Sequence, residues 1–130
     1  MLNQGCTRVE LGVQSTYDEV LTKINRGHTV ADNIRAIREL KNSGFKVGYH
    51  MLLGAPGSTP ESDLEMMKEI FTNSDYKPDA LKIYPCMVFK NTPLYNDWKN
   101  GQFTPLTTEQ SIPLIAEIKK HIPKYCRVMR

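Results

Sequence analysis

Cysteine is scarce in this 130-residue sequence, which contains three cysteines, at positions 6, 86 and 126. An odd number of widely separated cysteines does not indicate a disulfide framework, and none of them has a neighbour at the spacing of a metal-binding motif. We therefore expect Cys6, Cys86 and Cys126 to be small, buried or half-buried apolar residues, and we expect no metal site within this chain.

Long hydrophobic runs are also absent. No apolar stretch approaches the roughly 20 residues of a membrane span. The first residues lack the basic-then-apolar pattern of a signal peptide. We expect no membrane partner and a cytoplasmic location. No Gly-Lys-Ser/Thr sequence follows the glycines at positions 54 and 57, which excludes a phosphate-binding P-loop there.

The charge balance is mildly basic, with 17 Lys and Arg against 14 Asp and Glu and a net charge of +3. This balance suits an anionic partner without requiring one. Basic residues gather near the C-terminus, and we consider them as RNA-binding candidates: Lys119, Lys120, Lys124, Arg127 and Arg130. Such a cluster is able to contact phosphates, but a solvated helix face is the simpler explanation of this stretch taken alone.

Apolar segments and turn residues alternate along the chain. Strands are predicted at 8–14, 45–53, 80–88 and 125–129, and helices at 17–25, 29–42, 59–72, 92–100 and 107–121. Thr29 and Thr59 are predicted helix N-caps, and either Thr107 or Thr108 caps the last helix. The methionines at 51, 66, 67 and 87 are expected to fill the core.

Strands alternating with helices predict a parallel α/β sheet with right-handed crossovers. The nearly continuous apolar run at 45–53 is typical of a strand buried on both faces. About four strands are too few to close a TIM-type (β/α) barrel, so we expect part of such a barrel. Residues 14–15 lie at the end of the first strand and residues 54–61 follow the second, and parallel folds bind ligands at those strand ends.

Several motifs, taken in this order, resemble one known family. They are ELGVQS at 10–15, INRGH at 24–28, GAPGSTPE at 54–61, LKIYP at 81–85, NTPLY at 91–95 and KYCRVMR at 124–130. Residues 1–130 as a whole resemble the second half of a radical S-adenosylmethionine (radical SAM) barrel domain. Within that class, the set is similar to the family of Elongator catalytic subunits, which carboxymethylate the wobble uridine of tRNA.

The resemblance implies cofactors and partners. Members of this family bind SAM and a 4Fe-4S cluster, use acetyl-CoA as co-substrate and carry an acetyltransferase-like domain. The cluster is held by three cysteines in the other half of the barrel, and this motif is missing here. We therefore expect no activity of this chain alone. The expected partners are tRNA, the remainder of the barrel, the acetyltransferase-like domain and other Elongator subunits.

The resemblance also implies roles for individual residues. Gln14 matches a strand-end glutamine at the ribose or aminoacyl part of SAM, and an amide both donates and accepts hydrogen bonds. Arg26 matches an arginine that faces the SAM carboxylate, for which a guanidinium fork is well suited. His50 occupies a ribose-contacting position. Leu52, Gly54 and Pro56 belong to a segment that packs on adenine, and Tyr84 lies on its far side.

The residues by themselves allow simpler explanations. Gln14 could cap the next helix, Arg26 could pair with Asp18 or Glu19, and His50 could be a hydrogen-bonded core residue. The aromatic residues Tyr84, Tyr95 and Trp98 fit a core or an interface better than a base-stacking platform. Lys82 on a strand requires either a charged partner or a substrate anion, and we consider it a substrate-side candidate.

Two other functions remain open at this point. One is a non-catalytic half-barrel that binds tRNA or another partner through the basic C-terminus. The other is half of an unrelated TIM-barrel aldolase or isomerase, which requires a lysine or a carboxylate pair at the strand ends. Lys82 is the sole lysine so placed, and Glu10 lies early in its strand, so this second alternative ranks last.

Overall fold

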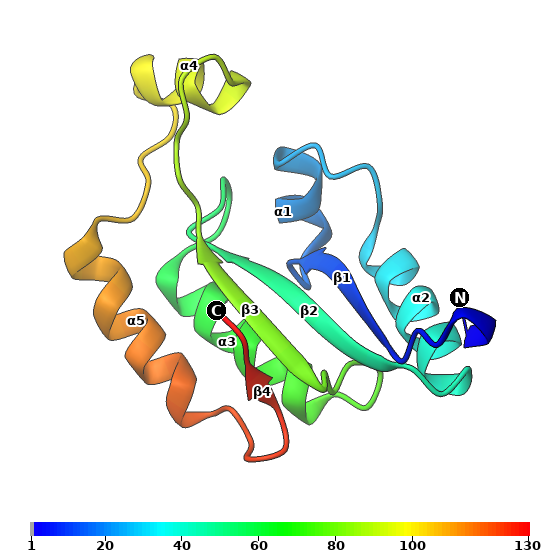
Figure 1. Cartoon of the computed structure of the whole chain (residues 1–130). Helices are drawn as coiled ribbons and strands as arrows, with labels where there is room; N and C mark the ends of the chain where they lie inside the picture. The colour runs from blue at the N-terminus through cyan, green and yellow to red at the C-terminus, as the bar shows by residue number, and fades with distance from the viewer. Residues whose placement is uncertain (1) are drawn as a thin grey trace.

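The computed structural model describes residues 2–130 and has one sheet of four parallel strands. The strands follow one another in space as they do in sequence: β1 (Arg8–Gln14), β2 (Lys46–Leu53), β3 (Ala80–Pro85) and β4 (Arg127–Val128) (Figure 1). A short 3-10 helix, η1 (Leu2–Gln4), precedes β1. The parallel α/β architecture predicted from the sequence is thus confirmed.

Five α-helices connect these strands: α1 (Asp18–Lys23), α2 (Val30–Asn42), α3 (Pro60–Thr72), α4 (Pro93–Lys99) and α5 (Thr108–Lys120). Figure 1 shows α2, α3 and α5 against the body of the sheet, whereas α4 stands apart beyond the end of β3. The longer helices begin at the predicted caps. Thr29 and Thr59 form capping boxes with Asp32 and Ser62, and Thr107, rather than Thr108, caps α5.

The hydrophobic core lies between the sheet and the helices. Alternate residues of the strands point into it, among them Val47, Tyr49, Met51, Leu53 and Leu81. They pack against side chains from the helices, including Ile37, Met66, Met67, Ile70 and Ile118. Burial of these apolar side chains is the main force that holds the helices on this face.

No helix of residues 2–130 covers the opposite side of the sheet, and we call this side the open face. Glu10, Gly12, His50, Lys82 and Tyr84 lie on it, and none of these five is fully buried. The sequence predicted that the apolar run of β2 is buried on both faces. This prediction is wrong, because the open face is not fully buried. Gly48 on this side is covered locally, because a Cβ there would lie 3.4 Å from Met129 Cε and 3.5 Å from Glu10 Cγ.

Three predicted strands are longer than the observed ones: β2 by one residue at its start, and β3 and β4 by more. β3 ends at Pro85 instead of residue 88, because its partner β2 ends at Leu53, which is paired with Pro85. Met87 therefore leaves the sheet and is 61% exposed, so the prediction that it fills the core is wrong. β4 begins at Arg127 instead of residue 125, because a turn places the Cys126 N–H on the Pro123 carbonyl.

The cysteines are half-buried or buried, as predicted. Burial raises the pKa of the Cys86 thiol and raises the pKa of Cys126 to about 11, so both are protonated at neutral pH. Within residues 2–130, no helix has both the length and the apolar character needed to cross a membrane.

Candidate functional site

A cluster of three charged or titratable side chains occupies the middle of the open face. One carboxylate oxygen of Glu10 on β1 accepts hydrogen bonds from His50 Nε2 on β2, at 2.7 Å, and from Lys82 Nζ on β3, at 2.5 Å. The pKa of Glu10 is lowered mainly by the hydrogen bond from Lys82 and next by the one from His50. The ionised Glu10 is therefore the charged partner that Lys82 requires. His50 is hydrogen-bonded, but its side chain is 31% exposed on the open face, so it is not the core residue of the simpler explanation.

Arg26 reaches from the end of α1 to the adjacent part of β1. Its Nε and Nη2 atoms donate to the Gly12 carbonyl at 3.3 and 3.2 Å. Asp18 instead accepts the Val30 N–H at 2.7 Å, and residues 2–130 contain no ion pair of Arg26 with Asp18 or Glu19. That explanation of Arg26 is wrong, and the guanidinium lies against the strand.

Gly12 makes this approach of Arg26 possible. A Cβ atom on residue 12 would lie 2.2 Å from Arg26 Nη2 and 3.1 Å from Gln14 Nε2. The guanidinium of Arg26 and the amide of Gln14 therefore converge over Gly12, on one side of β1. Gln14 and Arg26, two predicted cofactor-binding residues, are separated in sequence by α1. The absence of a side chain at Gly12 allows them to lie close together.

Gln14 has an unusual backbone conformation, with φ at 65°. The pairing of β1 with β2 shifts register between Leu11 and Gln14, so Gln14 leaves the regular pleat. Such a conformation is uncommon for a residue other than glycine and is often found at functional sites. Ser15, not Gln14, accepts the Tyr17 N–H at the start of α1, so Gln14 is not a helix cap.

The turn after β2 is held by a buried acid. The Asp63 carboxylate, 2% exposed, accepts the Gly54 N–H at 2.6 Å. Burial raises the pKa of Asp63 to about 6, although hydrogen bonds from Gly54 and Ser58 oppose this rise. Gly54 has φ at 64°, in the left-handed region that favours glycine. Asp63 therefore shapes the segment Gly54–Pro56 that the sequence predicts to pack on adenine.

The aromatic ring of Tyr84 lies beside His50 on the open face. Its centroid lies 5.8 Å from that of the His50 ring, in an edge-on arrangement at 60°. Leu52 is the strand partner of Tyr84. The structure thus gathers the predicted cofactor residues at the open face and at the carboxyl ends of β1, β2 and β3. Glu10 and Asp63 are part of the same arrangement. The sequence analysis considered Glu10 only as a possible strand-end carboxylate and did not consider Asp63.

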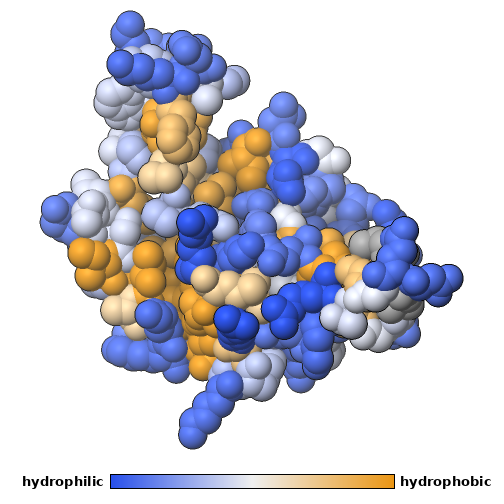
Figure 2. Space-filling view, viewed as in Figure 1, coloured by the Kyte–Doolittle hydropathy of each residue, from blue (hydrophilic) through white to orange (hydrophobic). Residues whose placement is uncertain are grey.

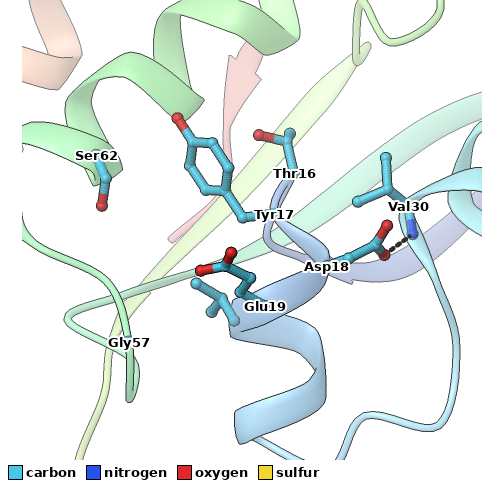
Figure 3. Close-up of a pocket in the computed structure, with 8 residues that line it drawn as sticks. Thr16, Tyr17, Asp18, Glu19, Val30, Gly57 and Ser62 are labelled. Carbon is cyan, nitrogen blue, oxygen red and sulfur yellow. Dashed lines mark hydrogen bonds between the residues drawn. The ribbon is translucent and has the colours of Figure 1, made fainter.

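A separate cavity of about 450 Å³ lies between the beginnings of α1 and α3 (Figure 3). Figure 3 shows Tyr17 and Glu19 at this cavity, with Gly57 and Ser62 on its other side. The pKa of Tyr17 is raised by burial and by Glu69, Glu65 and Asp63. The lining of this cavity includes two acidic residues, Asp18 and Glu19, and none of the predicted cofactor residues.

The basic C-terminal residues lie toward a different edge of the sheet. Arg127 pairs with Ala80, the first residue of β3, so the end of α5 and the loop before β4 are at the amino ends of the strands. Lys119, Lys120 and Lys124 are exposed there, and Lys120 pairs with Glu117 at 2.6 Å. Arg130 lies closer to the carboxyl ends of the strands, where its carbonyl accepts the Ile83 N–H. The RNA-binding candidates are thus mostly remote from the cofactor candidates.

A parallel sheet with covering helices on one face and polar side chains at its carboxyl ends is the α/β architecture expected of part of a (β/α) barrel. Comparison with known protein families then identifies the branch. Residues 1–70 match the radical SAM superfamily and residues 78–130 match the radical SAM C-terminal domain. The chain belongs to the radical SAM superfamily, as its motifs predicted.

Individual relatives support the narrower resemblance. The chain is 52% identical over 130 residues to a tRNA uridine(34) acetyltransferase of Methanocaldococcus infernus and 42% identical to human Elongator complex protein 3. The match covers 100% of this chain and 24% of each relative, so the chain spans about a quarter of the curated relatives' length. The solved structure of archaeal Methanocaldococcus infernus Elp3 with an N-terminal deletion matches with a TM-score of 0.95 and 52% identity, over 100% of this chain and 30% of that chain.

Proposed function

We propose that residues 1–130 form the second half of a radical SAM barrel domain in an enzyme that modifies the wobble uridine of tRNA. The modification is acetyl-CoA-dependent formation of 5-carboxymethyluridine. The observation that carries this proposal is the convergence of Gln14 and Arg26 over Gly12, beside the Glu10, His50 and Lys82 cluster. The names of the relatives, which act on tRNA uridine(34) or belong to Elongator, support the choice of substrate.

The residues on the open face fit the chemistry of SAM. Arg26 would hold its carboxylate, Gln14 and His50 its hydroxyl groups, and the Gly54–Pro56 turn with Tyr84 its adenine. The absence of a side chain at Gly12 lets the Arg26 guanidinium and the Gln14 amide lie next to each other there, and this juxtaposition supports the fit. When bound with its iron–sulfur cluster, SAM supplies radical chemistry to such enzymes. The residues of this chain bind and orient the cofactor.

The cysteines of this chain do not fit a 4Fe-4S cluster. Cys6 and Cys126 precede β1 and β4, whereas Cys86 follows β3 at the other end of the sheet. Among residues 2–130, no group of three His, Cys, Asp or Glu side chains is placed to hold a metal ion. We propose that the remainder of the barrel provides the cluster ligands, and that this chain alone is inactive.

The proposal extends to partners and location. The enzyme would act in the cytoplasm on tRNA, together with an acetyltransferase-like domain that handles acetyl-CoA and with other Elongator subunits. Lys82, which is hydrogen-bonded to Glu10, would face the substrate from the open face. Because Glu10 already neutralises Lys82, we expect Lys82 to orient the substrate rather than to bind an anion alone.

A segment exchange tests this function. The corresponding quarter of the Methanocaldococcus infernus enzyme is replaced by this chain, and 5-carboxymethyluridine is measured in tRNA after incubation with SAM and acetyl-CoA. We expect activity from the exchanged enzyme and none from the 130-residue chain. Arg26→Gln should lower SAM affinity, whereas Arg38→Gln, on the outer surface of α2, should not. An exchanged enzyme that is folded and iron-loaded but unable to bind SAM would disprove the proposal.

A non-catalytic tRNA-binding half-barrel is the second candidate, favoured by the exposed basic residues at the end of α5. Binding through these residues would depend on salt, because each neutralised phosphate releases counterions. Replacing Lys119, Lys120 and Lys124 with glutamine should then weaken the binding of every tRNA to a similar extent. Unchanged affinity and salt dependence in this variant would rule the second candidate out.

A further inference from the structure

The segment that leaves the sheet after β3 exposes three large apolar side chains. We call residues 86–106, which include α4, the α4 arm. Met87 and Phe89 are each 61% exposed and Trp98 is 47% exposed. In the part of the chain that the structure describes, no other helix or strand packs extensively against α4. Figure 2 shows hydrophobic side chains gathered between the hydrophilic tip of this arm and the body of the molecule.

A groove of about 410 Å³ runs along the arm. Met87, Tyr95, Trp98 and Leu106 provide its apolar walls, and Lys90 is the charged residue at its side. Its volume lies within the roughly 300–1,000 Å³ of small-ligand pockets. The rings of Tyr95 and Trp98 lie 5.5 Å apart with their planes inclined at 43°. The groove therefore offers aromatic faces next to a cation.

We propose that the α4 arm is a stacking platform for an unpaired base in the anticodon loop of the tRNA. This inference rests on the proposed function for the identity of the RNA. Aromatic side chains stack on bases of any sequence, and a neighbouring cation attracts the phosphate that follows the base. None of the described residues that line the groove carries a carboxylate, which would repel that phosphate.

The position of the arm favours this partner. The arm begins at the carboxyl end of β3, on the same side of the sheet as the cofactor candidates (Figure 1). Leu106, the last residue of the arm, lies against the turn after β2, because a Cβ on Gly54 would lie 2.7 Å from Leu106 Cγ. The basic C-terminal residues are mostly at the other end of the strands. A base held on the arm would therefore anchor the loop beside the predicted site.

The sequence provides a direct probe, because Trp98 is its single tryptophan. The 130-residue chain is titrated with an unmodified anticodon stem–loop RNA while Trp98 fluorescence and the anisotropy of a labelled copy of the RNA are followed. We expect RNA binding to quench Trp98. A blunt duplex RNA of equal length should quench it much less, because its bases are already stacked.

Variants separate stacking from folding. Trp98→Leu should weaken binding about tenfold, the lower part of the range for loss of one base–aromatic contact. Lys90→Gln should lower the salt dependence of binding by about one ion. Ile112→Ser removes an apolar side chain that is 63% exposed on α5, and it should leave affinity unchanged. Circular dichroism confirms that each variant is folded.

Three results would overturn the inference. The first is RNA binding, seen by anisotropy, that leaves Trp98 fluorescence and the affinity of Trp98→Leu unchanged. The second is equal quenching by duplex RNA. The third is a Trp98 already shielded from iodide without RNA, in a dimer that Met87→Ser dissociates, which would make the arm a contact between copies of the chain. An active exchanged enzyme combined with any of these results would retain the proposed function and reject the platform.

Discussion

Glu10 connects the three strands on the open face, because one of its oxygens accepts hydrogen bonds from both His50 and Lys82. Lys82 is the larger cause of the lowered Glu10 pKa. We therefore predict that Lys82→Met raises the pKa of Glu10, measured by NMR titration of its side-chain carboxyl carbon. Lys68→Met, which removes an exposed partner of Glu65 on α3, is the matched control and should leave the Glu10 pKa unchanged.

Asp63 introduces a second dependence on pH, with a definite sign. Its pKa rises from an ordinary 3.8 to about 6 on folding, so the folded chain binds the proton more tightly than the unfolded chain. Its contribution to stability is complete below the unfolded value and is lost as pH rises through about 6. We predict that wild-type chain gains roughly 2 kcal/mol relative to Asp63→Asn when pH falls from about 7.5 to about 4.5. Urea unfolding of both proteins at the two pH values measures this difference.

Asp32 provides the opposite control for that experiment. Hydrogen bonds from Thr29 lower its pKa, so its contribution to stability is present above its unfolded pKa and is lost as pH falls. Relative to Asp32→Asn, the wild type should therefore lose stability on acidification. A parallel pH dependence of wild type and Asp63→Asn would show that Asp63 is not titrating near pH 6.

At the scale of the helix, two adjacent threonines distinguish a cap from an ordinary surface residue. The Thr107 hydroxyl accepts the Gln110 N–H at 3.3 Å, and the Gln110 side chain accepts the Thr107 N–H at 2.9 Å. We predict that Thr107→Ala lowers the free energy of unfolding by about 1 kcal/mol. Thr108→Ala, at an exposed position inside the first turn, should change it by less than about 0.5 kcal/mol. Equal losses in the two variants would contradict the assignment of the cap.

At the scale of the strand, pairing rather than composition sets the length. The apolar residues after Pro85 continue the pattern of β3, but β2 has no residue left to pair with them, since Leu53 is its last. The Cys86 N–H makes the final contact, with the Leu53 carbonyl at 2.7 Å. The chain then leaves the sheet and exposes the side chains that form the groove of the α4 arm.

The whole molecule is a sheet with two unequal edges. β2 and β3 each pair with strands on both sides, whereas β1 has one described neighbour and β4 is a two-residue strand. We predict that amide hydrogen exchange is slowest in β2 and β3 and faster in β1, because strands with an unpaired edge open more readily. Exchange in β1 as slow as in β2 would contradict this order and would indicate that another chain covers the edge.

Local signals determined much of this protein. The capping residues at Thr29 and Thr59, the turn glycines and the apolar periodicity correctly predicted the helices and four parallel strands, because each depends on neighbours in sequence. The family motifs are also contiguous stretches, and the comparison with known families confirmed the superfamily. The roles of Gln14, Arg26, His50 and Tyr84 toward the cofactor remain predictions.

Only the tertiary structure decided which distant residues meet. Glu10 and Lys82 are 72 positions apart, and their contact depends on the parallel order of three strands. The need for Gly12 follows from a guanidinium that arrives from beyond the next helix, and the exposure of Met87 follows from the length of a different strand. Such outcomes depend on register and on approach across the sheet, and no stretch of neighbouring residues encodes them.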